Sequence, residues 1–376
     1  MGRFWSSSCH QSSPMCRSCG GQHTPESPLK RGLKRRAFSS MKVSQLGEFG
    51  LIESLQRVVD RRGVGARSRS DVILGIGDDA AAWQAEGFVQ LGTTDTLVQD
   101  IHFTPGTISW HNLGWKALAV NVSDIAAMGG TPTVAMVSLS LPLETEVEHM
   151  EEMYEGMAEC ARRFQTAVVG GNIARSPVIV VTVSLVGQVE KERMLTRSSA
   201  RAGDAIAVTG TLGASAAGLG MLKQRLALAP EISSALKEAH LRPVPRVEEG
   251  QTLAQHGVKS AIDISDGLLA DLTHICEASR VGARIHLQDI PVHPAARRAF
   301  GDDALGLALS GGEDYELLFT APGAVIERAK RGMLTPVRII GGVVSENPGK
   351  VTLVNQSGEE VEWAKGGWEH FGGSED

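Results

Sequence analysis

The chain has 376 residues and a formal net charge of −6, with 42% hydrophobic and 21% charged residues, and that length predicts two domains because it exceeds what one hydrophobic core usually serves. No apolar run approaches the roughly 20 residues that a membrane span needs, and an aromatic content of 5% disfavours a nucleic-acid surface built on base stacking. We therefore expect a soluble, cytoplasmic protein that binds neither membranes nor nucleic acid.

The charge is unevenly distributed along the chain. Residues 1–40 hold seven of the 37 basic groups and one of the 43 acidic groups, so residues 41–376 keep 30 basic and 42 acidic groups, a net charge of −12. An acidic protein that binds a polyanion needs bridging cations. Clustered carboxylates in the main body are therefore informative.

Residues 1–40 are rich in Ser, Cys and Arg and show no long apolar periodicity, which predicts a disordered extension or a start site wrongly assigned ahead of Met41. Enrichment in Arg and Ser with few acids is also typical of an organelle transit peptide. A zinc site is a further alternative, because a single CxxC and two histidines lie close together here. Its ligands would come from Cys9, His10, Cys16, Cys19 and His23.

From Glu48 onward, apolar strand-like runs alternate with helical patterns, which indicates an α/β protein with mixed sheets. We expect a first group of strands near 88–94, 133–141, 166–169 and 178–189, with helices near 112–128 and 145–164. A polar stretch at 191–203 precedes a helix from Ser215 and strands near 205–209, 261–264, 283–287, 315–320, 337–344 and 351–354. The boundary is expected near residue 190, giving an amino-terminal domain at 41–190 and a carboxyl-terminal domain at 191–376.

Short acidic motifs follow the predicted strands, whereas the phosphate-binding GxxxxGK[ST] motif is missing from the sequence. In Gly75–Asp79 two adjacent carboxylates follow two glycines, and in an extended segment only one of them can face a given site. Thr93–Asp95 ends an apolar strand, and hydroxyls beside a carboxylate are hard oxygen ligands that suit magnesium. An ordinary Asp-rich turn and a solvated loop remain open as alternatives for these two motifs.

Asp124 stands out because it breaks the pattern of its own helix. Leu113, Ala117, Val120 and Asp124 follow one another at helical spacing, so the carboxylate is predicted to lie on the inward stripe. A buried carboxylate is costly unless a cation or a hydrogen-bond donor meets it. Asp124 is therefore a candidate metal ligand, with a chance partly exposed Asp as the alternative.

Three further motifs combine glycines with oxygen ligands. Asp263 lies inside the apolar run of Ala261–Gly267, where Ser265 or Asp266 could cap the next helix. Ser310–Tyr315 is predicted to be a glycine-freed acidic turn, and Gly170–Asn172 a turn whose backbone amides could face phosphate. Such a set of oxygen-rich turns favours phosphoryl transfer in which several magnesium ions replace fixed lysines.

Taken together and in this order, the motifs resemble the thiamine-monophosphate kinase family. The matching segments are Gly47–Ile52, Gly75–Asp79, Thr93–His102, Trp115–Gly130, Gly170–Asn172, Leu195–Arg197, Gly203–Asp204, Val208–Gly213, His240–Pro243, Ala261–Gly267, Ser310–Glu316 and Lys365–Phe371. They span nearly all of residues 41–371. No single motif is diagnostic, but the ordered set is specific.

The resemblance implies an ATP- and Mg²⁺-dependent kinase that converts thiamine monophosphate to thiamine diphosphate by direct in-line transfer. It implies the two-domain fold of aminoimidazole ribonucleotide synthetase, in which two amino-terminal domains pair their sheets into the barrel of a homodimer. It assigns magnesium to Asp79, Thr93, Thr94, Asp95, Asp124, Asp263 and Asp266, ATP to Gly171, Asn172, Arg197 and Ser265, and thiamine monophosphate to His102, Glu313 and Trp368. Among these, Asp124 and Asp263 are expected to matter most for turnover.

The sequence departs from the family at Asn172-Ile173, where many members have Asp-Thr, and an amide is a weaker magnesium ligand than a carboxylate. Two other functions remain open: another ATP-dependent enzyme of the same fold, and a non-catalytic nucleotide-binding protein. Relatives that mature hydrogenase or form selenophosphate rely on a reactive cysteine. Cys160 and Cys276 are not so placed, since both lie in predicted helices as core residues.

Overall fold

The computed structural model describes residues 70–363 and, ahead of them, the helical residues 50, 52–53, 56–57 and 61. By its internal contacts the chain separates after Met41, and the fold below is that of the unit Lys42–Asp376. The predictions for residues 1–40, including a zinc site and a transit peptide, lie outside the described residues, as does Trp368.

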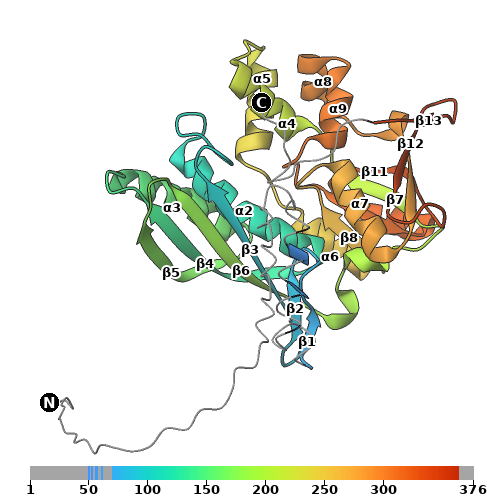
Figure 1. The fold of residues 1–376 in the computed structure, drawn as a ribbon, viewed down its shortest axis with the longest axis horizontal. Helices are drawn as coiled ribbons and strands as arrows, with labels where there is room; N and C mark the ends of the chain where they lie inside the picture. Colours follow the sequence, from blue (N-terminus) through green and yellow to red (C-terminus); the bar gives the residue numbers. More distant parts are fainter. Residues whose placement is uncertain (1–49, 51, 54–55, 58–60, 62–69, 364–376) are drawn as a thin grey trace, which may run out of the picture. The chain divides into compact units, whose positions relative to one another are not determined.

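A six-stranded sheet forms the first half of this unit (Figure 1), with the strand order β1-β2-β3-β6-β4-β5. Its strands are β1 (Val72–Leu74), β2 (Ala81–Gln84), β3 (Val89–Val98), β4 (Thr131–Leu141), β5 (Ala167–Arg175) and β6 (Val180–Val189). Only the pair of β4 and β5 is parallel. In β6 every second residue is buried, so one face of the sheet packs on the core and the other stays open.

Helix α2 (Trp110–Ala127) covers the buried face of this sheet, and α3 (Val147–Arg163) packs against α2. Ser109 starts α2 because its hydroxyl accepts a hydrogen bond from the Asn112 backbone at 3.2 Å. Glycines let the two helices approach closely. A Cβ on Gly114 would lie 1.7 Å from the Met153 carbonyl oxygen, and one on Gly156 would lie 1.8 Å from that of His111.

The second half holds a seven-stranded sheet with the strand order β13-β12-β9-β11-β7-β10-β8, and only β12 and β9 in it are parallel. Its strands are β7 (Ala205–Thr209), β8 (Ser260–Asp263), β9 (Gly282–His286), β10 (Leu317–Ala321), β11 (Val337–Val344), β12 (Val351–Val354) and β13 (Glu360–Val361). Leu318 packs in one hydrophobic cluster and its neighbours Leu317 and Phe319 in another. Both faces of this sheet are therefore buried.

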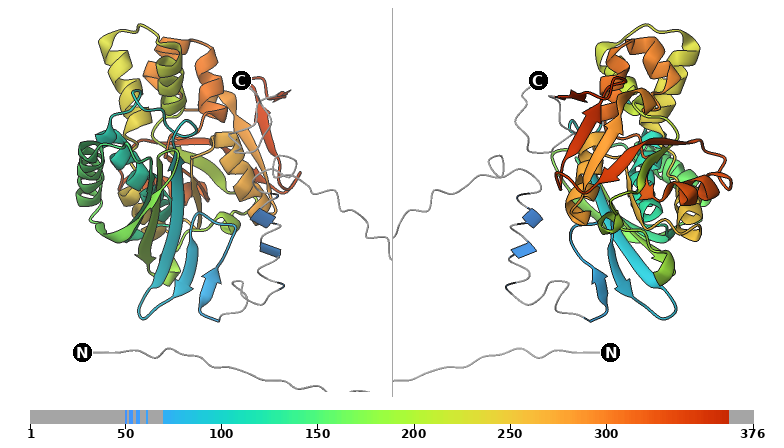
Figure 2. Two further views of the ribbon diagram at one scale, coloured as in Figure 1. Left: turned by 60° about the vertical axis from the view of Figure 1, so that its left-hand side comes forward. Right: turned by 90° about the vertical axis from the view of Figure 1, so that its right-hand side faces the viewer.

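Helices surround the second sheet, and α4, α5, α8 and α9 form a group of their own (Figures 1 and 2). The helices are α4 (Ala214–Gln224), α5 (Pro230–Leu241), α6 (Val247–Gln255), α7 (Leu268–Ser279), α8 (Pro294–Phe300), α9 (Asp303–Ser310) and α10 (Gly323–Lys330), with short 3₁₀ turns η2 (Lys191–Arg193), η3 (Arg197–Ser199) and η4 (Leu287–Asp289). No helix in the described part of the chain is both long and apolar enough to cross a membrane.

Helix α2 also connects the two halves, because it contacts α5, α6 and β8 as well as its own sheet. The Trp115 indole donates a hydrogen bond to the Pro243 carbonyl at 2.8 Å, and the Arg242 guanidinium lies 4.3 Å from the centre of the Trp115 ring system. Arg242 also forms an ion pair with Glu159 of α3 at 2.9 Å. These contacts hold the segment after α5 against helices α2 and α3 of the first half.

Most predicted elements are confirmed with shifts of a few residues at their ends. The predicted turn at Gly170–Asn172 is wrong, because these residues continue β5 in register with β4. Glycines usually indicate a turn, but a Cβ on Gly171 would lie 1.7 Å from the Val137 carbonyl oxygen, so close approach of the strands explains the glycine. Cys160 and Cys276 are buried in α3 and α7, as expected, and neither is in a disulfide.

Candidate active site

Three aspartates from distant parts of the sequence meet where the two halves join. Asp79 lies before β2, Asp124 lies on α2, and Asp263 ends β8. One carboxylate oxygen from each lies within 4.8 Å of the others. We call Asp79, Asp124 and Asp263 the acid group.

Asp79 is held by an arginine from the start of the second half. The Arg197 guanidinium donates to Asp79 Oδ1 at 2.8 Å and to Oδ2 at 3.2 Å, a bidentate pair. The backbone amide of Arg197 donates to Asp78 Oδ2 at 3.2 Å, so the two neighbouring aspartates face different partners. Arg197 was expected to contact ATP, and the structure places it directly beside the acid group.

Asp124 is flanked by residues of β3. Thr93 Oγ1 donates to Asp124 Oδ2 at 2.5 Å, and the Asp95 backbone amide donates to Asn121 Oδ1 on α2 at 3.1 Å. Thr93 and Asp95 point to the same face of the strand because side chains alternate. The strand therefore aims an additional hydroxyl and an additional carboxylate at the acid group.

Asp263 is fixed by a serine of the facing helix, since Ser123 Oγ donates to Asp263 Oδ2 at 2.6 Å. Both residues are buried. The hydrogen bond crosses between the two halves of the unit, so it fixes the position of β8 relative to α2. Sequence reasoning missed Ser123, although it immediately precedes a singled-out aspartate.

Asp124 and Asp263 of the acid group are held in an environment that disfavours their negative charge. Burial, together with the neighbouring Asp79, raises the pKa of Asp263 to about 8, and burial with Asp95 raises the pKa of Asp124 well above its ordinary value. A divalent cation among these oxygens would remove the repulsion, and oxygen donors are those that magnesium prefers. The donor set therefore fits magnesium.

Thr94 does not join this group. Its hydroxyl donates to the Val183 carbonyl at 3.1 Å and lies 3.1 Å from Ser184 Oγ on the open face of the sheet. A side chain between Thr93 and Asp95 has to point away from both. His102 follows β3, and its Nδ1 accepts a hydrogen bond from the Val98 backbone at 3.0 Å, which fixes the ring orientation.

Gly171 and Asn172 lie at a distance from the acid group of their own protomer. Register pairs Asp95 with Val183, Val183 with Val137, and Val137 with Gly171, so three strand spacings, roughly 14 Å, separate the first residue from the last. Asn172 pairs with Ser138, whose side chain is on the open face. Any nucleotide contact of Asn172 therefore has to come from that face.

A second cluster of possible ligands lies beside the first. Single ligand atoms of Asp266, Asp271 and His274 lie within 4.8 Å of one another. Asp271 Oδ2 accepts hydrogen bonds from the backbone amides of Asp266 at 3.2 Å and Gly267 at 3.0 Å, which fixes the turn that carries Ser265 and Asp266. Asp271 was missed, although it follows Leu268 by three residues and precedes Ile275 by four, so it lies on the inward stripe of α7 as Asp124 does on α2.

The loop Ser310–Tyr315 packs onto this turn. The Glu313 backbone amide donates to the Ser265 carbonyl at 2.7 Å, and that of Tyr315 donates to the Ile264 carbonyl at 2.9 Å. A Cβ on Gly312 would lie 2.3 Å from the Ser265 carbonyl oxygen, so glycine is required for this contact. The motifs Ala261–Gly267 and Ser310–Tyr315 are thereby brought together.

Tyr315 connects this loop to the acid group. Burial raises the pKa of the Tyr315 phenol well above its ordinary value, and the charges of Glu313, Asp95, Asp263 and Asp124 raise it further. Its hydroxyl is thus kept protonated and able to donate a hydrogen bond near Glu313 and the acid group.

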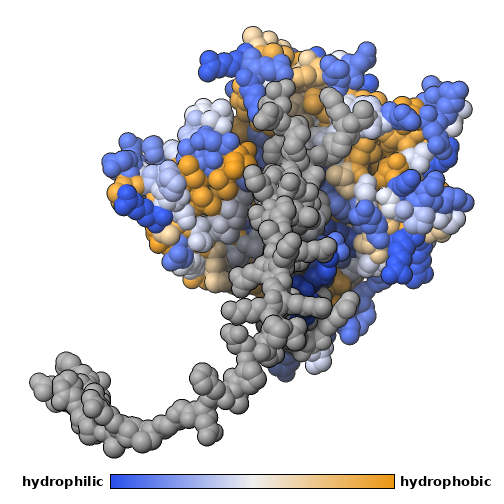
Figure 3. All heavy atoms as spheres, in the orientation of Figure 1, coloured by the Kyte–Doolittle hydropathy of each residue, from blue (hydrophilic) through white to orange (hydrophobic). Residues whose placement is uncertain are grey.

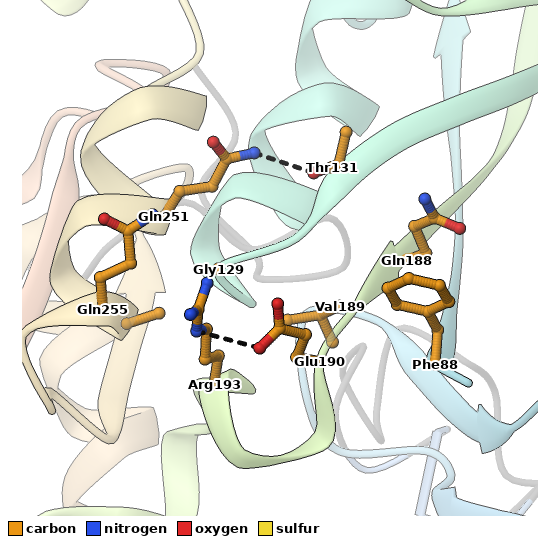
Figure 4. A pocket seen from close by; sticks show the side chains of 10 residues that line it. Phe88, Gly129, Thr131, Gln188, Val189, Glu190, Arg193, Gln251 and Gln255 are labelled. Atoms are coloured by element: carbon orange, nitrogen blue, oxygen red, sulfur yellow. Dashed lines mark hydrogen bonds and ion pairs between the residues drawn. The ribbon is translucent and has the colours of Figure 1, made fainter.

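A separate cavity of about 190 Å³ lies near the carboxyl end of α2 (Figure 4), lined by residues such as Phe88, Arg193 and Gln251. Gln251 donates to Thr131 Oγ1 at 2.9 Å, and Arg193 pairs with Glu190 at 3.1 Å. None of the singled-out site residues lines it. The acid group is therefore the better candidate for the active site.

Comparisons with known proteins match this architecture. Residues 77–189 match the family model of the AIR synthase related protein, N-terminal domain, and residues 201–368 match that of the C-terminal domain. Thiamine-monophosphate kinase from Escherichia coli O157:H7 is 41% identical over 331 residues, which cover 86% of this chain and 98% of the relative. The chain belongs to the thiamine-monophosphate kinase family.

Two further relatives support that assignment. The kinase from Aquifex aeolicus is 36% identical over 88% of this chain and 100% of its own length. A solved structure described as AaThiL complexed with AMPPCP and TMP superposes with a TM-score of 0.76 at 34% identity, covering 88% of this chain and 99% of that chain. The hydrogenase maturation protein HypE in complex with ATP, at 20% identity and a TM-score of 0.61, shares the fold.

Proposed function

We propose that this protein transfers the γ-phosphoryl group of ATP to thiamine monophosphate, forming thiamine diphosphate and ADP. The observation that carries the proposal is the convergence of Asp79, Asp124 and Asp263 into one group in a member of this kinase family. A relative's structure described with AMPPCP and TMP supports the choice of both substrates.

Magnesium is proposed as the counter-ion of the acid group. Asp79, Asp124 and Asp263 would hold it, with Thr93 and Asp95 beside them and Asp266 in the adjacent cluster. When bound there it would screen the charges of the two phosphorylated substrates. The Arg197 guanidinium is the positive charge that the chain itself supplies to this group, and we propose that it also faces the nucleotide, beside Ser265.

We propose direct in-line transfer. An oxygen of the substrate phosphate attacks the γ-phosphorus, a new P–O bond forms, and the bond between that phosphorus and the β–γ bridging oxygen breaks as ADP leaves. A phosphate nucleophile is already ionised near neutral pH, so no strong general base is needed. The chain's contribution is then to position and neutralise charge, with Glu313 and His102 proposed to contact the thiamine half.

A homodimer is proposed because the open face of the first sheet carries side chains suited to burial. Met136 on β4 is 50% exposed. On the same face the hydroxyls of Thr96 and Thr182 form a hydrogen bond with each other at 2.9 Å. The edge strand β5 adds exposed Val169, and also exposed Ile173 on the face opposite to Asn172, and Figure 3 shows hydrophobic patches on the side where α3 and β5 lie in Figure 1. Pairing two such sheets would also bring Asn172 into an enclosed environment.

We further propose two domains, 41–190 and 191–376, and a cytoplasmic location. The two sheets lie on either side of residue 190, and the two family models match residues 77–189 and 201–368. The cytoplasmic location is proposed because the proposed reaction consumes ATP, which the cytoplasm supplies.

The test is incubation of the protein with ATP, magnesium and thiamine monophosphate, followed by chromatography for thiamine diphosphate and ADP. Equimolar formation of both products is expected, and chelation of magnesium should abolish it. ATP binding without either product would indicate a non-catalytic nucleotide-binding protein. ADP formation with a different phosphate acceptor would indicate another enzyme of the same fold.

A further inference from the structure

Lys116 of α2 is among the largest fully buried side chains in the described part of the chain. Its side chain is 2% exposed, although lysine normally keeps its ammonium group in water. Burying an ammonium group is costly unless a negative charge and hydrogen bonds meet it. None of the motifs discussed above assigned this residue a role.

The partner of Lys116 is Glu313, which comes from the other half of the unit. Lys116 Nζ lies 2.7 Å from Glu313 Oε1, and His240 Nδ1 of α5 lies 3.3 Å from Glu313 Oε2. Each carboxylate oxygen therefore has its own partner. Because an ionised carboxylate only accepts hydrogen bonds, the His240 tautomer that carries its proton on Nδ1 is the one that can donate to Glu313, and Ser215 Oγ lies 3.1 Å from the same nitrogen.

The backbone of Glu313 is held as firmly as its side chain. Its φ angle is +67°, which is uncommon for a residue other than glycine, and its amide donates to the Ser265 carbonyl at 2.7 Å. A strained residue persists where its surroundings over-determine it. The loop, Lys116 and His240 together fix one position for this carboxylate.

The side chains of Glu313, Lys116 and His240 differ in how far they are exposed to solvent. The side chain of Glu313 is 28% exposed, whereas those of Lys116 and His240 are 2% and 8% exposed. Lys116 and His240 thus contact the carboxylate from buried positions, while part of the Glu313 side chain stays accessible. An ion pair that served only to connect the two halves could be buried completely.

We propose that Lys116 is a positioning residue for the phosphoryl acceptor: with His240 it clamps the Glu313 carboxylate in the one position in which it receives the thiamine half of thiamine monophosphate. This inference rests on the proposed function and deepens it. The thiamine half offers an amino group and a cationic ring, both of which a fixed carboxylate can meet. Lys116 and His240 act through Glu313 and touch neither phosphate donor nor acceptor.

The first test is Lys116→Met, which keeps the length of the side chain and removes its charge. We expect KM for thiamine monophosphate to rise about 10- to 100-fold, as for loss of a hydrogen bond to a charged group, with KM for ATP within about twofold. Lys330→Met is the matched control, because the ion pair of this exposed lysine of α10 in the described part of the chain is with Glu327, at 3.8 Å. It should leave both KM values unchanged.

A double-variant cycle shows whether Lys116 works through Glu313. Once Glu313→Gln has removed the carboxylate, Lys116→Met should add less than about twofold to KM for thiamine monophosphate, since coupled residues are not additive. The double variant contains no unpaired buried charge, so it remains measurable if Lys116→Met alone does not fold. Independent, multiplicative effects of the two changes would overturn the proposal.

His240 provides a conservative rescue. His240→Asn keeps an N–H donor near the position of Nδ1, whereas His240→Leu removes it. We expect the Asn variant to stay within about threefold of the wild-type KM for thiamine monophosphate and the Leu variant to rise about tenfold. Equal effects of the two variants would overturn the clamp.

The outcomes also separate this inference from the proposed function. If the wild type forms no thiamine diphosphate, the proposed function fails. If it does, but Lys116→Met leaves KM for thiamine monophosphate unchanged or raises both KM values equally, the positioning role alone fails.

Discussion

Two sets of carboxylates in this protein have opposite electrostatic surroundings: the compensated set is Glu313 with its partners Lys116 and His240, and the uncompensated set is Asp124 and Asp263. Glu313 receives a buried lysine, and although burial by itself would raise its pKa, the charge of Lys116 and the hydrogen bond from His240 bring that pKa down to about 2. Among the described residues no lysine forms an ion pair with Asp263 or Asp124, and burial raises the pKa of both. Arg197, whose charge lowers the pKa of Asp263, forms its ion pair with Asp79.

The opposite pKa shifts of Glu313 and of the two aspartates separate a carboxylate with a built-in counter-charge from carboxylates suited to bind a cation. A carboxylate with a built-in counter-charge is ready in one geometry and needs nothing further. Carboxylates left mutually repelling store an unfavourable interaction that an external cation relieves. The uncompensated set is therefore the one expected to bind metal, and the compensated set the one expected to recognise the organic substrate.

The largest expected effect follows from removing one uncompensated charge. Asp263→Asn should lower turnover about 100- to 1,000-fold, because stabilisation of transition-state charge is lost. The same change should leave the thermal midpoint at or above that of the wild type without magnesium, since it removes a buried carboxylate that is costly to ionise. Steady-state kinetics and calorimetry check both, and wild-type turnover would contradict the contrast between the two sets.

Magnesium itself should stabilise the fold through the acid group. Ligand at 100 times its dissociation constant adds about 2.7 kcal/mol to the free energy of unfolding, so the wild-type thermal midpoint should rise by several degrees. Asp263→Asn should lose most of that rise. Glu313→Gln, in the compensated set, is the matched control and should keep it; an equal loss in both would show that the sets are not distinct.

Thr93 and Thr94 of β3 point to opposite faces of the sheet, so they test whether proximity to the acid group decides a residue's effect. Thr93→Val removes the hydrogen bond to Asp124 and should lower turnover about tenfold, whereas Thr94→Val changes the open face and should stay within about twofold. Both changes replace a hydroxyl with a methyl group in the same strand. Equal kinetic effects would mean that the face of the sheet does not decide the role.

The smallest effect concerns stability in acid. The folded-state pKa of Glu313, about 2, is below its ordinary value of 4.5, so its stabilising contribution is complete above pH 4.5 and is lost as the pH falls toward 2. Urea unfolding at pH 5 and pH 3.5 should show the advantage of the wild type over Glu313→Gln shrinking with acidity. An advantage that grows instead would contradict the pairing with Lys116.

The sequence by itself determined much of the fold, because helices and strands leave a local signature. The apolar run Val180–Val189 shows the period of two that a half-buried strand requires, and the helical spacing of Leu113, Ala117 and Asp124 placed the aspartate inward. A carboxylate inside an apolar stripe is a local anomaly, so Asp124 and Asp263 could be singled out without coordinates.

Only the tertiary structure decided which residues meet. Ser123 gave no signal because a buried serine in a helix looks like any other until its partner is known, and the role of Asp271 became clear only from its hydrogen bonds with the Asp266 and Gly267 amides. Lys116 became informative only when the chain brought Glu313, almost 200 positions later, against its ammonium group. Pairing between distant residues depends on how sheets and helices pack, and no local pattern carries that information.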